Sequence, residues 1–173
     1  MAAEFHVQED GSKLRKLTAE QVAARLENYN GDGGFERDLK ALWAAAGEVL
    51  EAAVLETRSE RAAARLRARC TGPVDAAWVE AIAAFGIELY SRHPSIPAAI
   101  DRRARFTASL CEVLRQRFGD DTEGLCKAIE TLQRLSAYET EIMLAQIALL
   151  EADEAAEARG RQSETFERTV TEL

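Results

Sequence analysis

Apolar residues along this chain recur at intervals of three and four, the spacing that places them on one face of an α-helix. The clearest stripe runs through residues 35–58 and includes Leu39, Leu42 and Leu50. Similar patterns predict further helices over residues 18–29, 60–70, 75–92, 98–118 and 122–173. No segment shows the sustained alternation with β-branched residues that is typical of a strand. The pattern therefore predicts an all-α fold.

Two of the predicted helices begin with recognisable caps. Thr18 is followed three residues later by Gln21, which is the spacing of a capping box. The last helix starts near Asp121 and Thr122, and either side chain is suited to accept hydrogen bonds from the first turn. These caps fix where the first and last elements are expected to begin.

Loops and termini divide the chain. Residues 30–34 contain three glycines and are expected to end the first helix, and two prolines within residues 93–97 are expected to prevent helix there. Residues 1–15 lack apolar periodicity, so we expect a flexible arm. We predict one domain over residues 16–160 and the start of a helical linker at residues 161–173.

The composition fits a globular protein and limits its partners. Of the 173 residues, 47% are hydrophobic and 30% are charged, with a formal net charge of −8. A surface with that charge repels phosphate backbones, so nucleic acid is not an expected partner. No apolar stretch approaches the roughly 20 residues that span a bilayer, and the N-terminus has no signal-peptide pattern. We expect a cytoplasmic protein without membrane insertion.

Metal sites and disulfides are not expected. Cys70, Cys111 and Cys126 are odd in number and lack metal-ligand spacing, so we interpret them as small, reduced, buried residues. Residues 28–39 imitate the start of a calcium loop, but Leu39 stands where calcium needs a bidentate carboxylate. An ordinary loop between two helices is the prediction for that segment.

Groups that carry out catalysis are scarce. The only histidines are His6 and His93, and the chain has no glycine-rich phosphate loop, no serine elbow and no helix with Glu-x-x-His pairs. We therefore expect a protein that is not an enzyme.

Arginines cluster at two places. One group recurs along a side of the helix predicted at residues 60–70 and is expected to be a solvated face: Arg61, Arg65 and Arg69. The other group stands at the start of the helix predicted at residues 98–118: Arg102, Arg103 and Arg105. Cations oppose the helix dipole at that end. The second group is therefore either a docking point for an acidic partner or a second solvated face.

The last predicted helix carries a heptad seam. Residues in alternating steps of three and four form it: Ile142, Ala145, Leu149, Ala152, Ala156, Arg159, Ser163, Phe166, Val170 and Leu173. The seam predicts a homodimer, with Ile142, Ala145, Leu149 and Ala152 at its interface. The pattern stops at Leu173 without a cap, and we expect the helix to lead into a downstream signalling domain or partner.

Three stretches resemble the globin domain of bacterial globin-coupled sensors, over about residues 35–160. They are Val49-Leu50-Glu51-Ala52-Ala53, Gly72-Pro73-Val74-Asp75-Ala76-Ala77-Trp78-Val79, and Leu132 to Ala145. The resemblance implies a globin-like fold at the input end of a chemotaxis-type receptor or a cyclic-dinucleotide synthase. It also implies a homodimer in which the last two helices form a four-helix bundle with their twins.

The haem ligands of that family lack matching residues here. By resemblance, the proximal histidine position falls on Leu89 or Tyr90, and the distal tyrosine position falls near Val54 or residues 57–58. His93 lies three or four residues beyond the proximal position and is the alternative iron ligand, and a Tyr90 phenolate is another.

Three functions remain open. The first is a non-enzymatic, haem-free sensory or regulatory input domain of a chemotaxis-type signalling protein, relaying a signal through a dimeric helical bundle. The second is a gas or redox sensor that binds haem through His93. The third is a helical adaptor without a small-molecule ligand, in which the aromatic residues fill a core: Trp43, Trp78, Phe85 and Phe106. A pocket bordered by Leu89, Tyr90 and His93 would favour a sensor, and a solid core an adaptor.

Overall fold

The computed structural model describes residues 14–92 and 95–171, and within them it has six α-helices and no strand. The helices are α1 (Ala19–Asn30), α2 (Gly34–Thr57), α3 (Glu60–Thr71), α4 (Ala76–Tyr90), α5 (Ile96–Phe118) and α6 (Thr122–Thr171). The all-α prediction is confirmed, because the stripes of apolar residues produced helices wherever they were sustained.

The predicted caps fix both ends of the fold. The Thr18 backbone N–H donates to Gln21 Oε1 at 2.9 Å, and the Gln21 N–H donates to Thr18 Oγ1 at 3.2 Å, which completes the capping box. At the start of α6, Asp121 Oδ1 accepts from the Gly124 N–H at 3.0 Å. Asp121 therefore satisfies an N–H of the first turn of the last helix.

Helix α5 begins earlier than its sequence indicates. Pro97 lies in its first turn, and Ser95 Oγ accepts from the Ala98 N–H at 3.4 Å. A proline in this position costs no hydrogen bond, because first-turn N–H groups have no acceptor within the helix. The prediction that residues 93–97 cannot be helical was wrong for residues 96–97, and residues 93–94 lie outside the described residues.

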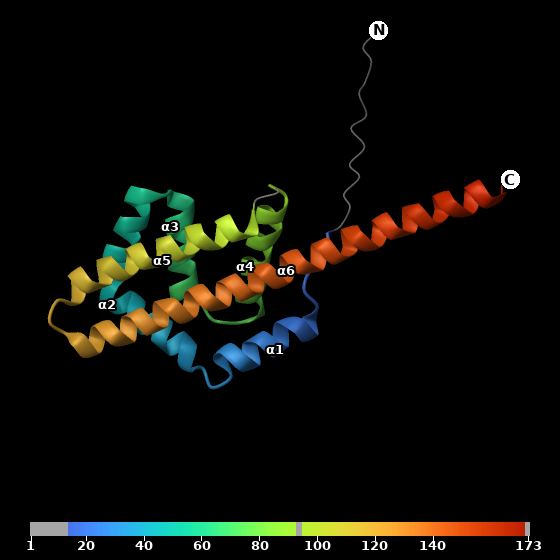
Figure 1. The fold of residues 1–173 in the computed structure, drawn as a ribbon. Helices are drawn as coiled ribbons and strands as arrows, with labels where there is room; N and C mark the ends of the chain where they lie inside the picture. Colours follow the sequence, from blue (N-terminus) through green and yellow to red (C-terminus); the bar gives the residue numbers. More distant parts are fainter. Residues whose placement is uncertain (1–13, 93–94, 172–173) are drawn as a thin grey trace, which may run out of the picture.

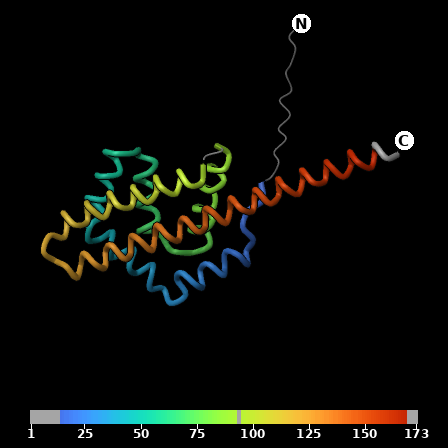
Figure 2. Tube along the Cα trace, viewed as in Figure 1, coloured from blue at the N-terminus to red at the C-terminus, as the bar shows by residue number. Residues whose placement is uncertain are grey.

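Helices α5 and α6 lie side by side and antiparallel, and they form one face of the molecule (Figure 1). Helix α4 packs against α6, helix α2 packs against α3 and α5, and α1 packs against α4 and the start of α2. The trace in Figure 2 shows α6 running past the other helices toward the C-terminus. Every other helix is thus anchored directly or through a neighbour to the α5/α6 pair.

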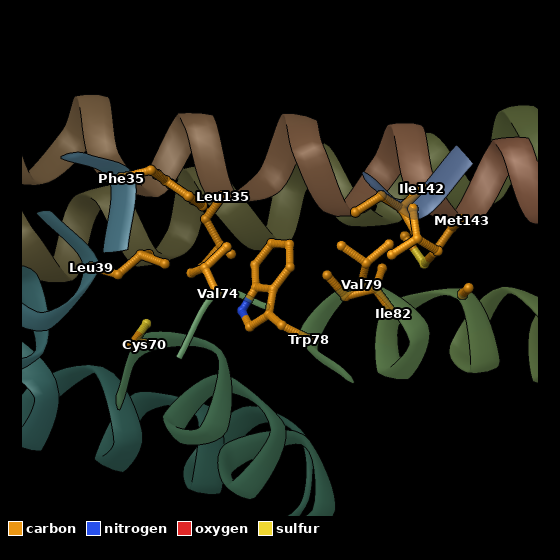
Figure 3. Close-up of a cluster of buried hydrophobic side chains, with 12 residues drawn as sticks. Phe35, Leu39, Cys70, Val74, Trp78, Val79, Ile82, Leu135, Ile142 and Met143 are labelled. Atoms are coloured by element: carbon orange, nitrogen blue, oxygen red, sulfur yellow. The ribbon is translucent and has the colours of Figure 1, made fainter. Parts of the chain in front are cut away.

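The core consists of two groups of buried side chains. The first joins α4 to α6 and to the start of α2, and Figure 3 shows Trp78 directed toward α6, with Val79 and Ile82 beside Ile142 and Met143. The second joins α2, α3, α5 and the start of α6 around the buried side chains of Leu42, Leu50, Val54, Leu110, Leu114 and Leu132. Burial of these apolar surfaces supplies the main driving force for folding.

The second half of α6 leaves the core. Leu150 is the last buried residue up to position 168, residues 159–168 are all exposed, and Phe166 has 71% of its surface exposed. The helix continues unbroken through residue 160, where we predicted the domain to end. In residues 14–92 and 95–171, neither α6 nor any other helix is long and apolar enough to cross a membrane.

The segment before α1 is attached to α6. Gln146 is fully buried, and its Nε2 donates to the Arg15 carbonyl at 2.8 Å while its Oε1 accepts from the Leu17 N–H at 3.2 Å. The Arg15 guanidinium also lies 2.9 Å from Asp153. Of the predicted arm, residues 1–13 lie outside the described residues, and Arg15 is held against the helix.

The three cysteines are free thiols in different surroundings. Cys70 and Cys111 are buried, as predicted, whereas Cys126 is exposed, so that part of the prediction was wrong. Burial, reinforced by the nearby Glu139, raises the pKa of the Cys70 thiol to about 12. This thiol stays protonated at neutral pH and acts as a small apolar side chain.

Candidate functional site

A partly enclosed cavity of about 260 Å³ lies between α3, α4, α5 and α6. Each helix contributes residues spaced by three or four, so that one face of every helix points into it. Its apolar walls include Ile82, Phe85 and Leu89 of α4, Phe106 of α5, and Met143 and Ile147 of α6. This volume is slightly below the range of about 300–1,000 Å³ typical of small-molecule pockets.

The polar part of the cavity lining is strongly cationic. Glu139 is the one carboxylate among the described residues that line the cavity. Five lining arginines supply positive charge: Arg58, Arg65, Arg69, Arg102 and Arg103. This excess of cations stands out in a chain with a net charge of −8. The cavity therefore combines apolar walls with a local positive charge.

Glu139 holds two of these arginines. Its Oε1 lies 3.1 Å from Arg69 Nε, and its Oε2 accepts a hydrogen bond from Arg103 Nη2. Arg69 is only 7% exposed, and its carbonyl accepts from Trp78 Nε1 at 3.2 Å. The prediction that Arg69 belongs to a solvated face was wrong, because a buried guanidinium here has a carboxylate partner.

The sequence did contain a signal for this buried cluster. Glu139 stands four residues after Leu135 and three before Ile142, on the apolar stripe of α6, where an unpaired carboxylate would be costly. A carboxylate at such a position indicates a buried cationic partner. The identity of that partner was hidden, because Arg69 and Arg103 lie 70 and 36 residues away in the chain.

The remaining arginines of the cavity are not neutralised in this way. The Arg58 guanidinium lies 4.9 Å from the centre of the Phe106 ring, and that of Arg65 lies 4.4 Å from the centre of Phe85. Arg102 forms no ion pair with any residue in the described parts of the chain. Arg58 and Arg102 have no carboxylate within ion-pair distance in the described parts of the chain, and Arg65 has Glu88 at 3.9 Å.

One nearby carboxylate is shared by several cations. Glu88 lies 3.1 Å from Arg61, 2.7 Å from Arg92 and 3.9 Å from Arg65. Partial burial, together with the positive charge of Arg61, lowers the pKa of the Arg65 guanidinium despite this carboxylate. The edge of the cavity formed by α3 and α4 therefore keeps an excess of positive charge.

The arginines at the start of α5 separate into different roles. Arg103 enters the cavity and binds Glu139, whereas Arg105 remains in solvent and pairs with Asp101 on its own helix at 2.8 Å. Arg102 lines the cavity. Of the two alternatives predicted for this cluster, the solvated face fits the exposed Arg102 and Arg105 and does not fit Arg103, which is half-buried against Glu139.

The described lining of the cavity does not fit the ligation of haem iron. Among the described residues that line it there is no histidine, cysteine or tyrosine, and Met143 is the one sulfur-bearing side chain. His93 lies outside the described residues. The described lining therefore supplies one thioether and no imidazole, thiolate or phenolate for haem iron.

Tyr90 is directed elsewhere. Its hydroxyl donates to Glu154 of α6, and Tyr90 is not among the lining residues. That hydrogen bond, with smaller contributions from burial and from the negative charges of Glu154 and Glu151, raises the pKa of the Tyr90 phenol. A raised pKa opposes the phenolate form, so this arrangement disfavours Tyr90 as an iron ligand.

Of the segment that imitates a calcium site, residues 31–33 form the predicted loop between α1 and α2, and the remaining residues belong to the two helices. Asp32 Oδ1 accepts from the Gly34 N–H at 2.8 Å, and Asn30 Oδ1 accepts from the Glu36 N–H at 2.9 Å. Gly33 adopts a left-handed conformation with φ of 70°. No group of three or more potential metal ligands occurs in residues 14–92 and 95–171.

An open groove lies along α5 and α6 on the outer side of the cavity. Small residues line much of it: Ala104, Thr107, Ala108, Ser136, Ala137, Ala145 and Ala148. Thr107 Oγ1 and Ser136 Oγ lie 2.9 Å apart and share a hydrogen bond across the two helices. A surface of small side chains permits another helix to approach closely.

The predicted interface residues occupy different environments. Ala145 lines the groove, Leu149 is half-buried one turn further on, and Ala152 is exposed. Ile142 has no exposed surface and packs against the α4 side of the core, so it belongs to the core rather than to the exposed seam. A heptad pattern cannot separate these cases, because a helix that packs within its own chain shows the same spacing.

The cavity and the groove share part of their lining. Four residues contact both spaces: Ile100 and Arg103 of α5, and Thr140 and Leu144 of α6. These four side chains therefore connect the cavity with the groove on the outer face of the α5/α6 pair.

Comparison of this chain with protein-family models, curated proteins and solved structures found no match.

Proposed function

We propose that this chain is a non-enzymatic, globin-like sensory or regulatory input domain of a chemotaxis-type signal-transduction protein, haem-free and working as a homodimer. The observation that carries the proposal is the shared lining, in which Ile100, Arg103, Thr140 and Leu144 border both the cavity and the groove. A displacement of these side chains in the cavity thereby alters the groove directly, without an intermediate layer of residues.

The groove is the docking face in this proposal. A second copy would lay its own α5 and α6 against the small side chains of the groove, which gives a four-helix bundle. Ala145 lines the groove, while Leu149 and Ala152 continue along α6 from it. Occupancy of the cavity would favour one packing of this bundle over another, as a two-state relay requires.

Helix α6 is the output element. It contributes Thr140, Met143 and Leu144 to the cavity and continues unbroken to Thr171, beyond the rest of the domain (Figure 1). A shift or rotation of an α-helix is transmitted along its hydrogen-bonded backbone. The exposed part of α6 would carry that displacement to a downstream module.

The cavity also favours a sensor over an adaptor. An adaptor that only displays its surface is expected to fill its interior, because an empty apolar cavity costs stability. Here Leu89 and Phe106 line a cavity of about 260 Å³. A ligand-binding role explains this arrangement.

Haem binding through His93 is the second candidate. Leu89 and Ile96 both line the cavity, and His93 lies between them in the sequence. Titration of the purified protein with haemin, followed by absorption spectroscopy, separates the two candidates. A sharp Soret band that is lost in His93→Ala would overturn the haem-free assignment. No specific band from a protein with intact helical circular dichroism supports it.

A further inference from the structure

The cavity has an uneven distribution of charge that indicates its ligand. Most of the lining from α4 and α6 is apolar, with Ile82, Phe85 and Ile147 among it, and Glu139 of α6 is its one carboxylate. Positive charge comes from Arg58 at the end of α2, Arg65 of α3 and Arg102 of α5. A ligand that fills this space must present carbon to one side and negative charge to the other.

The carboxylates in and near the cavity do not supply a negative charge to Arg58 or Arg102. Glu139 is occupied by Arg69 and Arg103. Glu88, outside the lining, is shared by Arg61, Arg65 and Arg92. In the described parts of the chain, no carboxylate lies within ion-pair distance of Arg58 or Arg102. The two arginines have donors to offer to an incoming anion.

We infer that the cavity binds a small amphipathic carboxylate, with its carboxylate at Arg58 and Arg102 and its hydrocarbon part against Phe85, Leu89 and Ile147. This inference deepens the sensory role proposed above and rests on it. The volume of about 260 Å³ is large enough for a short hydrocarbon chain. The Arg58 guanidinium lies over the ring of Phe106, and that of Arg65 lies over the ring of Phe85. These cation–π contacts hold both cations against the lining of the cavity.

Isothermal titration calorimetry with three probes tests the ligand class. Octanoate has both the charge and the chain, octanol has the chain alone, and acetate has the charge alone. Octanoate is expected to bind one per chain, octanol at least about tenfold more weakly, and acetate without measurable heat. Absence of octanoate binding, or equal affinity for octanol, would overturn the inference.

Matched variants locate the binding. Arg102→Gln should weaken octanoate about tenfold and leave octanol unchanged, while Arg105→Gln, on the same helix but paired with Asp101 in solvent, should change neither. Equal losses in both variants would mean that surface charge alone attracts the probe, which would refute the inference.

A second pair of variants tests the cavity itself. Ala99 lines it, whereas the neighbouring Ala98 is exposed and does not. Ala99→Phe should abolish octanoate binding, and Ala98→Phe should preserve it; if Ala99→Phe does not fold, Ala99→Leu serves the same purpose. Unaltered octanoate binding by a folded Ala99 variant would contradict the inference.

The ligand class and the sensory role can fail separately. Calorimetry reports binding to the cavity, while the sensory role predicts that octanoate also changes the dimer. Octanoate that binds without altering dimerisation supports the ligand class and overturns the relay.

Discussion

Gly86 of α4 lies directly against the backbone of Met143 of α6. A Cβ atom added to Gly86 would lie 3.0 Å from the Met143 carbonyl oxygen and 3.2 Å from its Cα. Met143 also lines the cavity, so this contact fixes how far α4 stands from the cavity wall of α6. A side chain at position 86 would therefore require the α6 backbone to shift by a few tenths of an ångström.

Replacing Gly86 by alanine is therefore expected to destabilise the fold. The added methyl group would push α4 away from α6, at a cost of about 1–3 kcal/mol in the free energy of unfolding. Urea denaturation followed by circular dichroism measures this loss. Gly160→Ala is the control, because nothing lies within 4 Å of a Cβ at that position. If the two variants were equally stable, the close approach at residue 86 would be refuted.

Glu139 is expected to be the most sensitive carboxylate in the core. Glu139→Gln would leave the buried Arg69 and the half-buried Arg103 without a countercharge, at a cost of about 2 kcal/mol. The matched control is Glu157→Gln, which removes an exposed pair with Arg161 on the same helix and should have little effect. Thermal denaturation of both variants makes the comparison, and an equal effect in the two would contradict the proposed cluster.

Glu36 is expected to make the stability depend on pH in the acid range. The hydrogen bond from Lys40, reinforced by the Val74 N–H at 3.0 Å, lowers the pKa of Glu36 below its ordinary value of 4.5. A carboxyl whose pKa is lower in the folded state stabilises it above the unfolded pKa, and this contribution is lost as the pH falls through the folded pKa.

The test is urea denaturation of Glu36→Gln between pH 7 and about pH 3. The variant should be less stable than the wild type at neutral pH, and the difference should shrink below about pH 4.5. Glu56→Gln, an exposed position on the same helix, should follow the wild type throughout. A constant difference between Glu36→Gln and the wild type would refute the role of ionised Glu36.

A homodimer through α5 and α6 predicts that a charge on their outer face separates the subunits. Leu149→Asp should reduce the mass measured by light scattering toward that of a monomer, because a carboxylate would have to be desolvated at the interface. Ala148→Asp, which lines the groove at an exposed position, tests the same face with less risk to folding. Leu55→Asp changes an exposed leucine of α2 and is the control. An unchanged mass in both α6 variants would contradict this interface.

Much of the fold follows from local chemistry. The capping box of Thr18 and Gln21 and the cap supplied by Asp121 involve residues within three positions of one another, so sequence spacing alone predicts them. We predicted this helix to begin at residue 98, but α5 begins at Ile96, because Pro97 is compatible with the first helical turn.

The candidate site could not be predicted in the same way. Arg69, Arg103 and Glu139 come from three helices, and no local pattern determines which guanidinium reaches which carboxylate. Gln146 is another example, since its partners are backbone groups of Arg15 and Leu17 at the other end of the chain. A cavity depends on how completely side chains from four helices fill a common space, and helical periodicity carries no information about that.

The most direct test of the proposed relay is whether filling the cavity changes the dissociation constant of the dimer. Sedimentation equilibrium measures the dimer dissociation constant of the wild type, of Ala99→Leu, which fills the cavity, and of Ala98→Leu, which does not. The proposed relay predicts that Ala99→Leu changes this constant about fivefold or more and that Ala98→Leu leaves it unaltered. Equal constants for all three proteins, or a monomer at every concentration, would contradict the relay between cavity and groove.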